Sequence, residues 1–411
     1  MKAKHLLTIT LLLISPYIFP QGAEEMTVSD EKMTNIPYIT FSPCIFRKCL
    51  PWRDGKYITI DGWGNFATLE WSKDKKTKKD KLDVVPIVKF PSQRVSTTFF
   101  YAQPETGWIW TKSNMKFLGY NADTKLTCDF IPVPSFKSWI ELVNSFSKYE
   151  LLFSYETQEP ITKCIKNYTY NSKTKHLEKM GEDSEILLWK QIEPFGKDFL
   201  AYEHFEYSKE LDKYIYRYFL YNFDTKEKTE NDLTKMLNKT LYEVDANIDV
   251  SISISSRGLV SKCYSLLEDC PVVITWKDNY EDPKLFPLNI LAPKGKTLEI
   301  QTVSPDCKWI FTYICYYEGL HKESLCKVGF IKISEEYPGI ASPLVILDEY
   351  AQKTYFNACS FIEHPEYGSC FICSYDNGNK KETRLYKMSD MQKEIDKILL
   401  EKTKSALSKG K

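Results

Sequence analysis

The chain has 411 residues, with 55 lysines and arginines against 55 aspartates and glutamates, so its formal net charge is zero. Apolar residues make up 43% of the chain and charged residues 27%, a balance typical of a globular protein and not of a disordered one. Because a nucleic-acid binder needs a basic surface for its phosphate contacts, zero net charge argues against that class of partner. Tyr, Phe and Trp number 27, 23 and 9, and since aromatic residues favour strands, the composition indicates an all-β fold.

The start of the chain has the layout of a secretory signal peptide. Lys2 and Lys4 precede an apolar run from Leu6 to Ile18, which is too short for a comfortable membrane span. We therefore expect residues 1–23 to be a leader and the mature chain to be secreted or periplasmic; an uncleaved N-terminal anchor is the alternative. No later segment is apolar over ~18 residues, so no stable membrane insertion is expected after the leader is removed.

The sequence repeats a short hairpin pattern. Tyr120–Lys125, Tyr170–Lys175 and Tyr221–Lys226 share the pattern Y-N-x-x-T-K, at spacings of 50 and 51 residues. Asn tolerates the left-handed backbone of a tight turn, so each copy predicts a β-hairpin. Weaker copies at the same period give seven structural repeat anchors, which are Trp71, Tyr120, Tyr170, Tyr221, Trp276, Ile333 and Met388. They define seven units of about 53 residues.

A second series of turns lies ahead of the anchors. In each unit a turn leads into an apolar, aromatic strand, as at Gly107-Trp-Ile-Trp110 and Gly368-Ser-Cys-Phe-Ile-Cys373. Each unit therefore contains two strands joined by a turn, a variable loop, and two strands joined by a hairpin. Seven such units predict an all-β, seven-bladed β-propeller of four-stranded antiparallel blades. A pair of β-sandwiches with coincidental spacing is the alternative. The predicted propeller domain covers residues 24–388, and its last blade lacks a fourth strand unless residues 24–36 supply it.

Two of these turns carry a family resemblance. Phe41-Ser-Pro43 and Val303-Ser-Pro-Asp-Cys-Lys-Trp-Ile310 resemble the F-S-P-D-G-K-x-I blade motif of TolB-like propellers, a group that is itself similar to WD-repeat proteins. The sequence departs from that motif at Cys307, which replaces the turn glycine, and at Lys226, which replaces the hairpin glycine. The resemblance implies a propeller and a tendency to bind other proteins, and it transfers no catalytic residue.

Three segments have apolar residues at helical spacing. The first is residues 135–146, part of which also fits a strand, and the second is residues 229–244. The third, residues 389–411, is a Lys-rich amphipathic helix in which Ser389 and Gln392 match a capping box. We expect this C-terminal helix either to dock on the propeller or to present an interaction face, with one or two short helices between blades.

The twelve cysteines all follow the leader, and an even count in an oxidising compartment permits disulfides. Within the predicted blades, two pairs face each other across a hairpin and are the disulfide candidates: Cys263 with Cys270, and Cys315 with Cys326. Cys370 and Cys373 have the spacing of half a zinc site, but residues i and i+3 of a strand point to opposite faces. We therefore expect structural cysteines, with no metal and no cofactor.

No common catalytic motif is present in the sequence. Glu203, His204 and Glu206 bring carboxylates near an imidazole, but Glu203 points away from His204 on a strand, so no catalytic residue is assigned. We expect a module that binds another protein, with a glycan as the second option because the loop Asp61–Asn65 offers Trp63 for stacking. An exported hydrolase or lyase, with its site at the mouth of the central channel, is the alternative function.

Overall fold

The computed structural model describes residues 26–27, 34–41, 48–60, 65–88, 100–113, 116–130, 140–145, 150–158, 163–171, 173–174, 176–180, 194–195, 198–208, 213–222, 228–230, 250–252, 257–260, 272–275, 284–288, 290–291, 296–316, 326–350 and 355–409. The chain divides into two compact units. Unit 1 comprises residues 1–35, 231–352 and 393–411, and unit 2 comprises residues 36–230 and 353–392.

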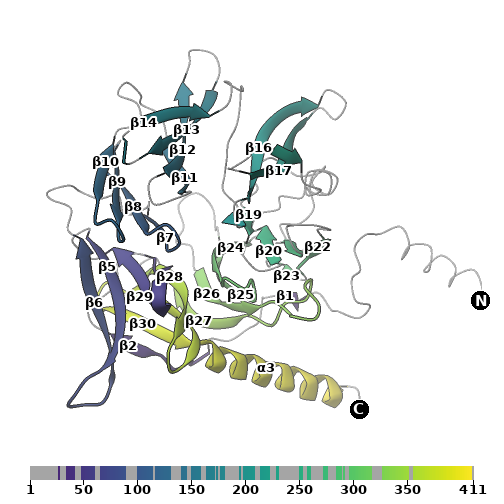
Figure 1. The fold of residues 1–411 in the computed structure, drawn as a ribbon. Helices are drawn as coiled ribbons and strands as arrows, with labels where there is room; N and C mark the ends of the chain where they lie inside the picture. The colour runs from purple at the N-terminus through teal and green to yellow at the C-terminus, as the bar shows by residue number, and fades with distance from the viewer. Residues whose placement is uncertain are drawn as a thin grey trace, which may run out of the picture. The chain divides into compact units, whose positions relative to one another are not determined.

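The strands of unit 2 form antiparallel sheets of four strands each (Figure 1). In four of these sheets the strands pair in chain order. They consist of β3 (Leu50–Pro51), β4 (Tyr57–Ile60), β5 (Phe66–Lys73) and β6 (Asp80–Val88); β7 (Phe100–Gln103), β8 (Trp108–Ser113), β9 (Lys116–Asn121) and β10 (Thr127–Phe130); β11 (Ile140–Ser145), β12 (Glu150–Gln158), β13 (Lys163–Asn171) and β14 (His176–Met180); and β15 (Pro194–Phe195), β16 (Asp198–Ser208), β17 (Lys213–Asn222) and β18 (Lys228–Glu230).

The fifth sheet of unit 2 joins the two ends of the described chain. It contains β28 (Tyr355–His364), β29 (Gly368–Asp376) and β30 (Lys381–Lys387), and β2 (Ile39–Phe41) pairs with the outer edge of β30. Ile39 lies opposite Leu385 and Phe41 opposite Thr383, so a strand near the N-terminus completes the last sheet (Figure 1). The sequence leaves the closure of the last blade open, with residues 24–36 as the segment considered; the pairing with β30 instead begins at Ile39.

Unit 1 contains two more antiparallel sheets of four strands and one short parallel pair. The sheets consist of β19 (Val250–Ile252), β20 (Arg257–Val260), β21 (Val272–Thr275) and β22 (Lys284–Pro287), and of β24 (Lys296–Val303), β25 (Trp309–Tyr316), β26 (Cys326–Lys332) and β27 (Val345–Tyr350). The pair joins β1 (Met26–Thr27) to β23 (Ile290–Leu291). The described chain thus contains seven four-stranded antiparallel sheets, each a simple meander apart from the strand exchanged by β2.

The hairpins between third and fourth strands follow from the repeated N-x-x-T-K pattern. The Asn121 Oδ1 accepts hydrogen bonds from the backbone N–H groups of Asp123 and Thr124, both at 3.0 Å. Lys125 then adopts a φ of 60°, the left-handed conformation for which many propellers use glycine. Asp74 makes the same turn, with Lys78 at a φ of 59°. The first hairpin is therefore aligned on Asp74, and Trp71 lies three positions before it, whereas Tyr120 directly precedes Asn121.

Apolar clusters lie between pairs of sheets, either consecutive in the chain or, in one case, the first and the last. One joins the β3–β6 and β7–β10 sheets through Ile58, Phe66, Ile109 and Leu118. In unit 1 a cluster joins Val273 of β21 to Ile310, Ile331 and other residues of the β24–β27 sheet. A third cluster packs the C-terminal sheet against the β3–β6 sheet, and its members are Phe41, Cys49, Tyr57, Leu69, Leu82, Ile362, Cys370, Ile372 and Leu385. Sheet faces that pack on the next sheet are the arrangement expected of blades.

Two of the three predicted helices are not found where the structure describes their residues. Residues 140–145 form β11, so the helix predicted for residues 135–146 is wrong there; a bulge between Leu142 and Asn144 breaks the strand alternation and produces helix-like spacing. Thr229 and Glu230 belong to β18, and the rest of the predicted helix at residues 229–244 lies outside the described residues.

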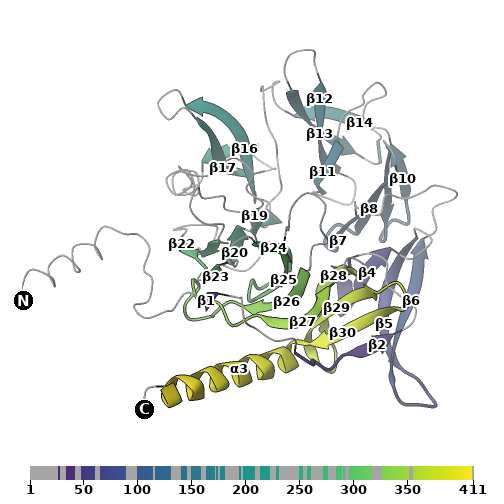
Figure 2. The ribbon, with the colours of Figure 1, turned by 180° about the vertical axis from the view of Figure 1, so that it is seen from behind.

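The predicted C-terminal helix is present. Helix α3 (Met388–Lys409) follows β30 without a loop and runs as one uninterrupted helix (Figure 2). It begins one residue before Ser389, so Ser389 lies in the first turn and does not precede it. None of the helices that the structure describes is long and apolar enough to cross a membrane.

Candidate binding surface

The turn between β24 and β25 contains the sequence that resembles the TolB-like blade motif. The Ser304 Oγ accepts hydrogen bonds from the backbone N–H groups of Lys308 at 3.1 Å and Trp309 at 2.9 Å, and it donates one to Asp306 Oδ1 at 2.6 Å. Cys307 has a φ of 51°, the left-handed conformation that the motif assigns to glycine, and it is buried. These contacts fix the turn and leave the side chains of Asp306 and Lys308 at the surface.

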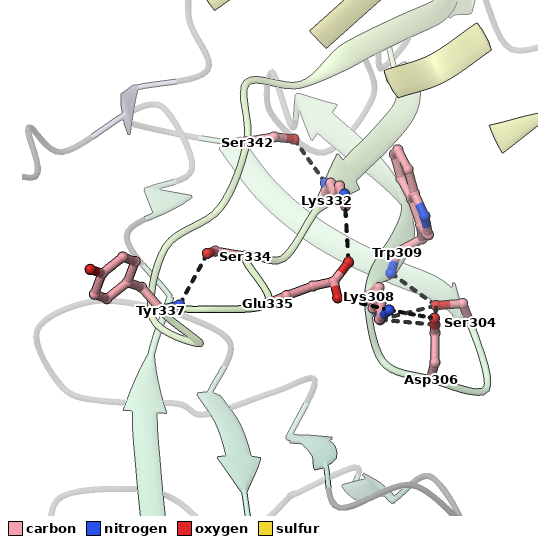
Figure 3. Close-up of polar contacts among 9 residues, drawn as sticks. All are labelled: Ser304, Asp306, Lys308, Trp309, Lys332, Ser334, Glu335, Tyr337 and Ser342. Carbon is pink, nitrogen blue, oxygen red and sulfur yellow. Dashed lines mark hydrogen bonds and ion pairs between the residues drawn. The ribbon is translucent and has the colours of Figure 1, made fainter. Parts of the chain in front are cut away.

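The loop between β26 and β27 is held by its own hydrogen bonds. The Ser334 Oγ accepts from the backbone N–H of Tyr337 at 3.0 Å, and the N–H of Ile340 bonds the carbonyl oxygen of Tyr337 at 2.8 Å. At the base of the loop, the N–H of Lys332 bonds Ser342 Oγ at 2.8 Å. Figure 3 shows the hydrogen bonds of Ser334 and Ser342 together with the β24–β25 turn. The loop is therefore ordered by these three hydrogen bonds within the protein.

Charged side chains connect the turn and the loop. Glu335 forms an ion pair with Lys308 at 3.0 Å and lies 3.9 Å from Lys332, whose Nζ is 5.7 Å from the centre of the Trp309 ring. Glu335 keeps 58% of its side chain exposed, so solvent screens these pairs and each stabilises the fold by less than about 1 kcal/mol. Their groups remain accessible from outside the protein.

Tyr337 is the exposed aromatic residue of this surface. It is 49% exposed, and in Figure 3 its ring points away from Glu335 and Lys308. The Tyr337 hydroxyl donates a hydrogen bond to Glu336, which raises its pKa above its usual value. We define the Tyr337 surface as Asp306, Lys308, Glu335, Glu336 and Tyr337. It combines one ordered aromatic ring with charges of both signs.

Unit 2 contains a second polar cluster, between the β28–β29 turn and the β5–β6 hairpin. His364 stacks on Tyr367 with 4.5 Å between ring centres and meets Trp71 edge-on at 4.4 Å. Its Nδ1 accepts hydrogen bonds from the backbone N–H groups of Glu366 at 3.1 Å and Tyr367 at 3.3 Å. Burial lowers the pKa of His364, which favours the neutral form that this acceptor role requires.

Charged groups surround the ring stack. Lys73 forms ion pairs with Asp80 at 3.1 Å and with Glu366 at 2.6 Å, and the Lys387 Nζ lies 3.6 Å from the centre of the Tyr367 ring. The Tyr367 hydroxyl donates a hydrogen bond to Asp80, which lowers the pKa of Asp80 and raises that of Tyr367 to about 12. Because these groups satisfy one another, the cluster is suited to holding two sheets together.

A comparable contact joins the β3–β6 and β7–β10 sheets. Arg53, in the turn after β3, makes a two-pronged ion pair with Asp123 in the β9–β10 hairpin, with the second hydrogen bond at 3.0 Å. The Arg53 Nε donates to the carbonyl oxygen of Pro104 at 2.5 Å. In both clusters the first turn of one sheet binds the last hairpin of its neighbour, and the spacing of the sequence repeat does not reveal this contact.

Of the disulfide candidates, the structure describes the backbone of one pair. Cys315 on β25 and Cys326 on β26 are directly opposite partners in the strand register. Cys263 and Cys270 lie outside the described residues. Cys370 and Cys373 lie on β29, and both are buried free thiols. Within the described ranges, no group of three or more His, Cys, Asp or Glu side chains is placed to hold a metal ion.

The repeat anchors occupy corresponding places in the sheets. Trp71, Tyr120, Tyr170 and Tyr221 lie near the ends of the third strands β5, β9, β13 and β17. Ile333 directly follows β26 and Met388 directly follows β30, whereas Trp276 lies outside the described residues. Glu203, His204 and Glu206 are on β16, where a bulge lies between His204 and Glu206. Residues 61–64, including Trp63, are outside the described residues.

No protein-family model and no curated protein matches the chain. Among solved structures, the chain matches β-propeller proteins over most of its length. An oligogalacturonate lyase in complex with manganese matches at 10% identity and a TM-score of 0.45, covering 87% of this chain and 97% of that one. The β-propeller domain of the Trilobed protease from Pyrococcus furiosus matches at 7% identity and a TM-score of 0.38, covering 84% and 94%. The N-terminal domain of Nup159 matches at 9% identity and a TM-score of 0.39, covering 88% and 99%. Likenesses this distant carry no argument about the function of the chain.

Proposed function

We propose that the chain is an exported seven-bladed β-propeller that binds another protein through the Tyr337 surface. Seven four-stranded meanders, each about one sequence repeat long, support the blade count. The packing within unit 2 supports a closed ring, because the C-terminal sheet packs against the β3–β6 sheet and takes its last strand from residues 39–41. The leader at residues 1–23 and a Cys315–Cys326 disulfide belong to the same proposal, since both fit an exported chain.

The single observation that carries the proposed binding function is that Tyr337 exposes its ring from a loop whose backbone is held by hydrogen bonds. The residue is half-exposed, yet its backbone N–H and carbonyl groups are both hydrogen-bonded within the loop. A partner that covers the ring gains buried area without having to order the loop, which removes a large part of the usual cost of binding. Tyrosine is also among the residues that most often dominate the energetics of protein interfaces.

The charged neighbours give the surface its expected specificity. In the free protein, Glu335 pairs with Lys308 at 3.0 Å and with Lys332 at 3.9 Å. A partner with its own charges exchanges these solvent-screened pairs for intermolecular ones, which favours partners of complementary charge pattern. The expected partner is a folded protein with a shallow pocket for the tyrosine ring.

Site-specific photo-crosslinking tests the proposal. A benzophenone amino acid placed at position 337 is expected to give one dominant protein adduct in the compartment to which the chain is exported. Position 38 is the matched control, because Tyr38 is 41% exposed but packs against Arg384, whose guanidinium carbon is 4.2 Å from the ring centre. Excess wild-type chain should suppress the adduct, and excess Tyr337→Ala should not. Identical adducts at both positions, or none at 337, would overturn the proposal, and a carbohydrate adduct would reassign the surface to a glycan.

A further inference from the structure

Helix α3 changes character half-way along its length. Its first half buries Met388, Met391 and Ile395, each 3% exposed or less. In its second half the apolar side chains face solvent: Leu399 is 45% exposed, Leu400 54% and Leu407 69%. An ordered helix that leaves three leucines in water has an apolar face that none of the residues described by the structure covers.

The exposed leucines form one face. With 3.6 residues per turn, Leu399 and Leu407 lie two turns apart along the helix, and Leu400 adjoins Leu407 at a spacing of seven residues. Thr403 lies between them, and its hydroxyl donates a hydrogen bond to the carbonyl oxygen of Leu399 at 2.9 Å. The only polar side chain on this face is therefore satisfied within the helix.

The charge of the same segment is strongly positive. Residues 397–411 contain five lysines and a single acidic residue, Glu401. Lys402 and Lys404 are exposed and, at 100° per residue, flank the apolar face on its two sides. This contrasts with the chain as a whole, in which acidic and basic residues balance to zero net charge. A leucine face bordered by lysines on a helix too polar to span a bilayer is typical of segments that lie in a membrane interface.

We propose that the second half of α3, residues 397–409, binds the surface of an anionic lipid bilayer, with Leu399, Leu400 and Leu407 in the headgroup boundary and the lysines against lipid phosphates. The charge complementarity selects this occupant, because an apolar protein groove has no need of an excess of positive charge. The helix lies along the surface and does not cross the membrane. The interaction does not depend on the Tyr337 surface or on the function proposed for it.

Vesicle flotation with the full chain tests the proposal, using phosphatidylcholine vesicles with and without 30% phosphatidylglycerol. We expect binding to the anionic vesicles that weakens at high salt. Each surface lysine contributes about fivefold to the partition coefficient, so Lys402→Gln/Lys404→Gln/Lys409→Gln should reduce binding by roughly a hundredfold. Leu399→Ser/Leu400→Ser/Leu407→Ser should also abolish it, and since these side chains are exposed, the variant should melt as the wild type does.

The matched control is Lys75→Gln/Lys76→Gln/Lys79→Gln, which removes three exposed lysines from the β5–β6 hairpin and should bind as the wild type does. The apolar N-terminal residues are the same in all variants, so any lipid binding by that segment is common to them. A difference in binding between wild type and the α3 variants therefore reports on α3. Equal loss in the control and the α3 lysine variant would overturn the proposal, as would equal binding of wild type and leucine variant. Cross-linking of α3 to a protein, with no vesicle binding, would overturn it in favour of a protein partner.

Discussion

Gly119 on β9 lies directly opposite Trp110 on β8, and its lack of a side chain is what allows the indole to lie there. A Cβ added at Gly119 would be 2.3, 2.5 and 2.6 Å from three atoms of the Trp110 ring, where contacts below 3.0 Å are not tolerated. The ring cannot easily retreat, because Trp110 and the neighbouring Trp108 are both fully buried and stack with 4.6 Å between ring centres. Gly119→Ala should therefore force two indoles to move.

The expected destabilisation is about 3 kcal/mol, at the upper end of the range for overpacked cores. The measurement is denaturant unfolding followed by tryptophan fluorescence, with near-UV circular dichroism to report the loss of indole stacking. Gly368→Ala is the matched control: its added Cβ meets nothing within 4 Å, and only its φ of 68° is strained, which costs about 1 kcal/mol. Gly119→Ala/Trp110→Leu should recover stability relative to Gly119→Ala. If Gly119→Ala unfolds together with Gly368→Ala, the packing of the β7–β10 sheet is not as described.

Three further predictions concern the contacts between and within sheets. Because burial lowers the pKa of His364 in the folded protein, the unfolded chain binds the proton more readily, so stability should be greatest above about pH 6.5 and fall as the pH drops. His364→Asn keeps an acceptor but does not titrate, so its melting temperature should fall less than that of the wild type between pH 7.5 and 5.5. Equal falls would refute the role of the imidazole. A double-mutant cycle of Arg53→Ala and Asp123→Ala should give a coupling of about 1 kcal/mol in denaturant unfolding, since the pair is two-pronged but partly exposed; strictly additive effects would count against it. Finally, Cys315 and Cys326 should resist alkylation in the unreduced exported protein, as intact mass would show, and their joint replacement by serine should lower stability by roughly 2–3 kcal/mol; labelling of both thiols without reduction would exclude the bridge.

The hairpins of this protein could be predicted from the sequence because their chemistry is local. The Oδ1 atoms of Asn121 and Asn171 each accept hydrogen bonds from the backbone N–H groups two and three positions further along, so the pattern N-x-x-T-K specifies the turn wherever it occurs. The left-handed backbone at Lys125 and Cys307 also follows from their alignment with glycine positions of other propellers.

Contacts between distant parts of the chain could not be predicted in this way. The strand Ile39–Phe41 pairs with β30, more than 300 residues further along the chain. Three residues are too few to show a strand pattern in the sequence, so this pairing could not be predicted. The packing of His364 against Trp71 joins strands β28 and β5 of two different sheets. The Tyr337 surface could not be predicted from the sequence either. Its loop is ordered by hydrogen bonds to the hydroxyls of Ser334 and Ser342, and nothing in the sequence distinguishes these two serines from other loop serines.

An experimental density map of the mature chain, by crystallography or electron microscopy, tests the central claim most directly. The account predicts seven four-stranded blades around one axis, with Ile39–Phe41 completing the C-terminal blade and Tyr337 exposed on its ordered loop. Sheets that pack face to face as two β-sandwiches, or a C-terminal sheet completed by another segment, would contradict it.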